Sequence, residues 1–295
     1  MSSFLSAIYK KRPINLWVED EPTRAYLGHV WQDNDIELLL AGGAEQVQSL
    51  VHDSGQRNVF GYRSRGFDFD RSNAQVWRDH DSTQVWISGA FEAANFILDE
   101  DAIAGSIFNT AESSARVIAE NMLRLAAPQS WWMACRSVVA SLSKRANLGF
   151  IRRPDRARVA DKTSALAWII TSSWTADVAP SVPGLVSPEA IEERITSEER
   201  RFSAMTSTSQ WKSEFSGKEI LVDLVSMVWT TIPPRMRKTA ILNDFAKAVA
   251  HKQRRLGTIP QEIHDLRSAL RLRVGLAPAN ITKSYLSAFP SSPPE

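Results

Sequence analysis

Four acidic residues in the first third of the chain have the type and spacing to support metal-dependent chemistry. Glu19 directly follows the apolar run 14–18, Asp68 and Asp70 form an Asp-x-Asp pair, and Glu92 comes further along. Carboxylate oxygens are the ligands that Mg²⁺ and Mn²⁺ prefer, and an ion held in this way promotes cleavage of a phosphodiester. Glu19, Asp68 and Asp70 are therefore candidate metal ligands, and together with Glu92 they are the candidate catalytic residues; their roles are those that a family resemblance, carried by the segments around them, implies.

Basic residues gather in several places where they could contact phosphate groups. Arg63 and Arg65 precede the Asp-x-Asp pair, and a basic stretch runs from Lys144 to Arg158. The other candidates for binding nucleic acid lie towards the C-terminus: Arg235, Arg237, Lys238, Arg267 and Arg271. Arginine and lysine supply the sequence-independent part of nucleic-acid binding. The alternative for every group is an ordinary solvated surface or local ion pairs, for example of Arg63 and Arg65 with Asp68, Asp70 or Glu92.

Composition limits the setting in which this chemistry could operate. The 295 residues carry 35 basic and 33 acidic side chains, a net charge of +2, so any nucleic-acid surface must come from local clustering. The single cysteine, Cys135, excludes an intramolecular disulfide and favours a reduced, cytoplasmic protein. The five histidines lack zinc-ligand spacing, and no Walker-type phosphate loop or membrane-spanning apolar run is present.

The elements that must position these residues alternate between strands and helices in the first hundred residues. Strands are predicted at 14–18, 36–40, 59–62 and 84–87, with helices from Pro22 to about Trp31 and from Ala44 to Val51. Alternation of this kind predicts a mainly parallel sheet flanked by helices. Because carboxyl ends of parallel strands meet at one edge, residues that follow the strands should gather there.

The remainder of the chain has the pattern of an all-helical region. Long helices are predicted at 101–125, 129–145, 161–173 and 235–255, and Thr258 to Gln261 resembles a capping box that begins a further helix. The predicted organisation is an α/β domain at 1–105, a helical domain at 106–285 and a flexible tail at 286–295.

Four ordered segments of the α/β part resemble a TOPRIM domain, the scaffold of the OLD-like nucleases. Leu16-Trp17-Val18-Glu19 resembles the first strand with its catalytic glutamate, and Leu38-Leu39-Leu40-Ala41-Gly42-Gly43 resembles the second strand and its glycine turn. The segment 59–68 is similar to the third strand with its Asp-Arg-Asp-Phe run, and 91–99 is similar to the Glu-Ile-Glu-Asn segment of defence-associated members. The match covers about the first third of the chain and is nearest to the small effector nuclease of the PARIS anti-phage system.

The chain departs from the TOPRIM pattern at three acidic positions. Ser64 and Gly66 stand where the Asp-x-Asp pair would be, and Ala94 replaces the second acid of the fourth segment. A hydroxyl is a poor Mg²⁺ ligand beside a carboxylate, and glycine has no side chain, so the usual metal clamp is absent in this register. Asp68 and Asp70 would rebuild the site only if their loop folds back towards Glu19; otherwise they belong to a polar turn. Glu92 is retained, and the alternative to a catalytic role is that it caps a helix or forms a local pair.

The resemblance implies one of two functions. The first is an anti-phage effector related to metal-dependent nucleases, a Mg²⁺- or Mn²⁺-dependent endonuclease acting on RNA such as tRNA or on DNA, dimeric and held by a partner ATPase. The second is a pseudo-nuclease that keeps the fold as a partner- or nucleic-acid-binding subunit. A third possibility, from the helical content alone, is a helical assembly protein without either function.

Overall fold

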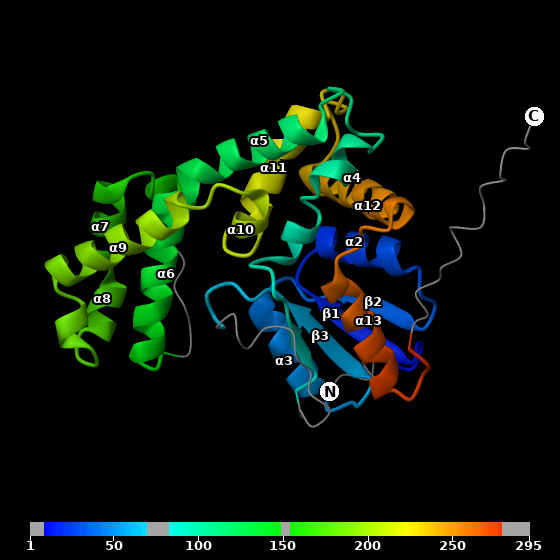
Figure 1. Ribbon diagram of the computed structural model, residues 1–295. Coiled ribbons are helices and arrows are strands. Elements are labelled where there is room, and N and C mark those ends of the chain that lie inside the picture. The colour runs from blue at the N-terminus through cyan, green and yellow to red at the C-terminus, as the bar shows by residue number, and fades with distance from the viewer. Residues whose placement is uncertain (1–8, 70–82, 149–153, 279–295) are drawn as a thin grey trace, which may run out of the picture. The chain divides into compact units, whose positions relative to one another are not determined.

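The computed structural model describes residues 9–69, 83–148 and 154–278 and confirms the mixed α/β fold class (Figure 1). The predicted Asp70 and the predicted tail 286–295 lie outside these residues. The residues cluster into two compact units, each made of separate stretches of chain. We call 1–62, 77–86 and 243–295 the sheet unit, and 63–76 and 87–242 the helical unit. This division differs from the contiguous domains expected from the sequence, which stay a prediction.

A four-stranded sheet in the order β2-β1-β3-β4 forms the centre of the α/β part. The strands are β1 (Ile14–Val18), β2 (Ile36–Leu40), β3 (Val59–Arg63) and β4 (Val85–Ile87), within one residue of the predicted runs. β1 pairs in parallel with both β2 and β3. All five residues of β1 and of β3 are buried, as expected for the central strands of a parallel sheet covered on both faces.

Helices of the sheet unit pack closely on the strands. α3 (Ala44–Ser54) places Val47 and Val51 in an apolar cluster with Trp17 of β1. The approach of α3 to β3 requires glycine at position 61, because a Cβ atom there would lie 2.6 Å from Cγ1 of Val47. On α2 (Glu21–Trp31), the Tyr26 hydroxyl donates a 2.6 Å hydrogen bond to Gln253. The C-terminal segment is therefore an integral part of the sheet unit.

Asp20 caps α2. Its side chain accepts a 2.9 Å hydrogen bond from the backbone N–H of Thr23, while Glu21 pairs with Arg24 at 2.8 Å. Asp20 and Glu21 therefore have local structural roles at the start of α2.

The helical unit contains most of the other helices. They are α4 (Glu100–Ala104), α5 (Ala115–Ala126), α6 (Ser130–Arg145), α7 (Lys162–Ile170), α8 (Ser173–Val178), α9 (Pro188–Ser203), α10 (Thr208–Lys212) and α11 (Gly217–Val228). α12 (Lys238–Leu256) begins in the helical unit and continues into the sheet unit, which also contains α13 (Gln261–Arg273). Within the described ranges, no helix combines the length and apolarity needed to cross a membrane.

Two helix predictions were wrong. The continuous helix at 101–125 is interrupted between α4 and α5, where Asn109 donates from Nδ2 to the carbonyls of Ala104 and Ser113 and accepts from Ser113 N–H. Such side-chain bonds satisfy backbone groups outside a helix and so compete with it. The predicted capping box at Thr258 is also absent, because α13 has Pro260 at its N-cap and, in the described chain, no side chain capping it.

The only cysteine lies in the interior of the helical unit. Burial raises the pKa of the Cys135 thiol to about 12, so the thiol stays protonated near pH 8. We expect the folded protein to react with Ellman's reagent far more slowly than the guanidinium-unfolded protein. Equal rates in the two states would show that the Cys135 side chain is accessible.

Candidate functional site

The carboxyl ends of the strands meet at one edge of the sheet, as the site prediction requires. The register pairs Val18 of β1 with Leu40 of β2 and with Tyr62 of β3. The backbone N–H of Gly42 donates a 3.1 Å hydrogen bond to the carbonyl of Glu19, so the glycine turn lies beside the start of the segment after β1. The Glu19 residue is only 6% exposed. The sheet therefore holds a carboxylate at the predicted edge.

Ser64 and Gly66 stand where the Asp-x-Asp pair was expected. Their hydrogen bonds join two loops of the helical unit. The hydroxyl of Ser64 accepts a 3.3 Å hydrogen bond from the backbone N–H of Ala93, and Gly66 N–H donates to the carbonyl of Phe91 at 2.9 Å. Gly66 has a φ of +54°, in the left-handed region that favours glycine. This loop is built around the residues that replace the two aspartates.

The arginines that flank these positions form buried ion pairs. Arg63 binds Asp68 through Nη2, and its guanidinium lies over the Phe69 ring, 4.8 Å from the ring centroid. Arg65 donates to the carbonyl of Ser213 and has Glu214 at 3.8 Å. Pairing of Arg63 with Asp68 is the alternative to phosphate contact that the sequence left open. The pairing of Arg65 with Glu214, 149 positions further along, was not anticipated.

Glu92 caps the start of α11. Its carboxylate accepts hydrogen bonds from the Ser216 hydroxyl at 2.8 and 3.0 Å and from the backbone N–H of Lys218 at 3.0 Å. The first N–H groups of a helix have no partner within the helix, and its N-terminus carries partial positive charge. The Glu92 carboxylate accepts a hydrogen bond from one of these N–H groups and places negative charge at the positive end of α11. Its observed role is therefore structural.

Of the four predicted acids, the structure describes Glu19, Asp68 and Glu92. Glu19 belongs to the sheet unit, whereas Asp68 and Glu92 belong to the helical unit. Among the described residues, no group of three or more histidine, cysteine, aspartate or glutamate side chains could hold a metal ion. The proposed rebuilding of the site by Asp68 and Asp70 stays a prediction, because Asp70 lies outside the described residues.

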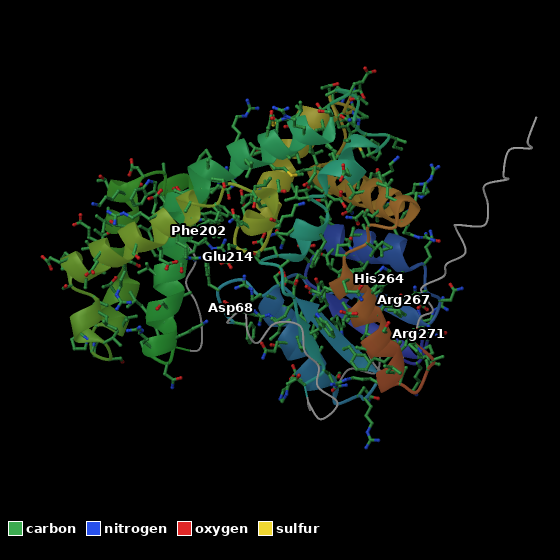
Figure 2. All side chains as sticks on the ribbon, viewed as in Figure 1. Asp68, Phe202, Glu214, His264, Arg267 and Arg271 are labelled. Atoms are coloured by element: carbon green, nitrogen blue, oxygen red, sulfur yellow. The ribbon has the colours of Figure 1, made fainter. Side chains whose placement is uncertain are left out.

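The remaining basic candidates fall into two kinds of environment. Arg235, Arg237 and Lys238 are exposed at and before the start of α12. Arg267 and Arg271, labelled along α13 in Figure 2, both bind Asp33, at 2.8 and 3.1 Å, and Arg271 also binds Asp35 at 2.8 Å. These ion pairs fasten α13 to the turn after α2. Nucleic-acid contact by any of the five stays a prediction.

A pocket of about 560 Å³ in the helical unit contains residues that the sequence did not single out. Its lining, which we call the basic pocket, comprises Arg65, Phe67, Phe69, Ser137, Ala140, Ser141, Lys144, Arg145, Arg201 and Glu214. Sequence reasoning identified Arg65 and the basic stretch that begins at Lys144. A signal for the rest was available in α6, where Ser137, Ala140, Ser141 and Lys144 follow the spacing of one helix face.

Comparisons with protein-family models and with curated protein sequences found no match to this chain.

Proposed function

We propose that this chain is a TOPRIM-like protein of a bacterial defence system that binds nucleic acid as a catalytically degenerate subunit. The observation that carries the proposal is the environment of Glu92, an acid retained from the TOPRIM pattern. Its carboxylate accepts hydrogen bonds from Ser216 and Lys218 at the positive end of α11. A divalent cation would have to compete with these donors and with the helix dipole.

The other acidic positions support the same proposal. Ser64 and Gly66 supply no carboxylate, and their backbone and hydroxyl groups join the loop after β3 to the segment around Phe91. The charge of Asp68 is already balanced by Arg63. A carboxylate paired in this way is a weaker ligand for a metal ion, because binding the ion would mean giving up the guanidinium.

A second candidate function, the metal-dependent nuclease, is favoured by Glu19. This residue is buried beside the Gly42 turn at the edge where the strands of an α/β sheet present ligand-binding groups. In such an enzyme, Glu19 would hold Mg²⁺ or Mn²⁺, which would supply electrostatic stabilisation of the phosphodiester. A partner ATPase, a homodimer and a cytoplasmic setting belong to both candidates as expectations from the resemblance and from the single cysteine.

An assay of cleavage and binding with the same samples separates the two candidates. Purified wild type and Glu19→Gln are incubated with tRNA, single-stranded RNA and plasmid DNA in Mg²⁺ or Mn²⁺, and the products are separated on denaturing and native gels. We expect no cleavage by either protein and an equal mobility shift by both. Cleavage by wild type that disappears in Glu19→Gln would establish the nuclease instead. Absence of both cleavage and shift would contradict both candidates.

A further inference from the structure

The basic pocket lies entirely within the helical unit and is built by four parts of it. Arg65, Phe67 and Phe69 come from the loop after β3, while Ser137, Lys144 and Arg145 come from α6. Arg201 of α9 and Glu214 complete it; Glu214 is labelled in Figure 2. α6 and α9 are joined by a 2.7 Å hydrogen bond from the Ser137 hydroxyl to Glu198. Packed helices thus fix two of the pocket walls.

The charge of the lining favours an anion. Four of its side chains are basic and one, Glu214, is acidic. Glu214 already has Arg201 at 3.2 Å and Arg65 at 3.8 Å, so these interactions hold two guanidinium groups in place. Lys144 and Arg145 are exposed at the last turn of α6. Two exposed cations at the end of α6, beside guanidinium groups that Glu214 holds in place, suit a phosphate group.

The aromatic side chains of the pocket favour a ligand that also carries a ring. Phe67 is held by edge-on contacts with Phe91 and Phe202, at centroid distances of 4.8 and 6.3 Å. Phe69 is half-buried, with the guanidinium of Arg63 over its ring. Ring faces beside cations are the combination that single-strand-binding proteins use for base and phosphate. A volume of about 560 Å³ falls in the range of small-molecule sites.

We propose that the basic pocket binds a nucleoside phosphate, with its phosphate at Lys144 and Arg145 and its base against Phe67 and Phe69. The ligand is either a free nucleotide or one unit of a single strand, since both present the same groups. If the ligand is one unit of a single strand, the inference rests on the proposed function, and the basic pocket is the site of the proposed nucleic-acid binding.

The test uses the full chain and two probes: a fluorescein-labelled single-stranded RNA of about 12 nucleotides, within the known site sizes of single-strand binding, and adenosine 5′-monophosphate as competitor. In the double variant Lys144→Glu/Arg145→Glu, we expect RNA affinity to fall on the order of tenfold. The slope of log affinity against log salt should decrease by about 1.4, which corresponds to two lost phosphate contacts. Phe69→Leu, which keeps an apolar side chain but removes the ring, should weaken binding roughly fivefold with little change in slope.

Two matched controls carry the same change of charge. Arg116→Glu/Arg124→Glu alters exposed residues of α5 outside the pocket lining and should bind like wild type. Arg235→Glu/Arg237→Glu tests the other basic stretch. If this variant loses RNA affinity while Lys144→Glu/Arg145→Glu retains it, nucleic-acid binding stands and the pocket proposal fails. Equal circular dichroism and thermal unfolding of all variants would establish that each is folded.

Competition decides the source of the ligand and keeps the two proposals separate. Displacement of RNA by the mononucleotide supports the pocket as a site for a nucleotide unit. RNA binding that the mononucleotide does not displace supports an extended strand as the ligand, provided that Lys144→Glu/Arg145→Glu weakens this RNA binding. If wild type binds no RNA or DNA, the proposed function fails. Calorimetry with the mononucleotide then decides the pocket: binding that depends on Lys144 and Arg145 supports it, and no binding overturns it.

Discussion

Replacing Gly217 with alanine is expected to destabilise the helical unit on the order of 3 kcal/mol. Gly217 is the first residue of α11, directly after Ser216, which donates to Glu92. A Cβ atom at position 217 would lie 1.8 Å from Oδ1 of Asn95 and 2.9 Å from its backbone nitrogen. Relief requires α11 to move away from Asn95, which would disturb the hydrogen bond from Asn95 Nδ2 to the carbonyl of Phe215 at 3.0 Å.

Denaturant unfolding followed by tryptophan fluorescence would measure this effect, with Gly184→Ala as the matched control. A Cβ at Gly184 would have no described atom within 4 Å, and the φ of Gly184 is outside the left-handed region. The control should therefore change the free energy of unfolding by less than about 0.5 kcal/mol. A Gly217→Ala variant as stable as wild type would contradict the close contact between α11 and the segment after β4.

Replacing Asp33 with asparagine is expected to destabilise the sheet unit by about 3 kcal/mol at neutral pH. The Asp33 side chain is 5% exposed and accepts hydrogen bonds from Arg267, Arg271 and the backbone N–H of Asp35. Asparagine is nearly isosteric but leaves two guanidinium groups without their buried carboxylate. Asp35→Asn is the control, since its side chain is 41% exposed and, among the residues that the structure describes, binds only Arg271; we expect a loss below about 1 kcal/mol.

The Asp33 effect should depend on pH with a definite sign. Burial alone would raise the pKa of Asp33, but the N–H of Asp35 and the guanidinium groups of Arg267 and Arg271 outweigh burial and hold the pKa below its ordinary 3.8. A carboxyl with a lowered folded-state pKa stabilises the protein above its unfolded-state value. This contribution is lost as pH falls through the folded-state pKa. The difference in unfolding free energy between wild type and Asp33→Asn should therefore shrink in acid. A constant difference would contradict ionisation of Asp33 as its source.

Much of the α/β fold follows from local sequence patterns. β1 and β2 were predicted at their observed bounds because short apolar runs ended by acidic or glycine residues indicate buried strands. The interruption between α4 and α5 was missed because Ile107 and Phe108 continue an apolar pattern, while the bonds of Asn109 decide the local conformation. The spacing of apolar residues indicates which residues are buried. It does not indicate which side chain will hydrogen-bond to the backbone and so interrupt a helix.

The roles of the candidate site residues were less predictable, because their partners are far away in sequence. Glu92 binds residues 124 and 126 positions later, and Arg271 binds Asp33 across 238 positions. Residue type indicates that these side chains are charged, but a single sequence does not indicate which distant charges pair with one another. The same holds for the basic pocket, where the loop after β3 meets helices α6 and α9 only in the folded helical unit.

The interleaving of the two units constrains the order in which a growing chain can mature. During synthesis, the strands and α2 leave the ribosome well before the segment that carries Gln253, Ile263 and Arg271. Until that segment arrives, the Tyr26 hydroxyl, the Trp31 indole N–H and the Asp33 carboxylate have not met the partners that they bind in the finished molecule. The sheet unit therefore gains these contacts only after the segment that carries α13 has been made, and a ribosome that stalls before α13 leaves their partners on α2 and the turn after it exposed to aggregation or proteolysis.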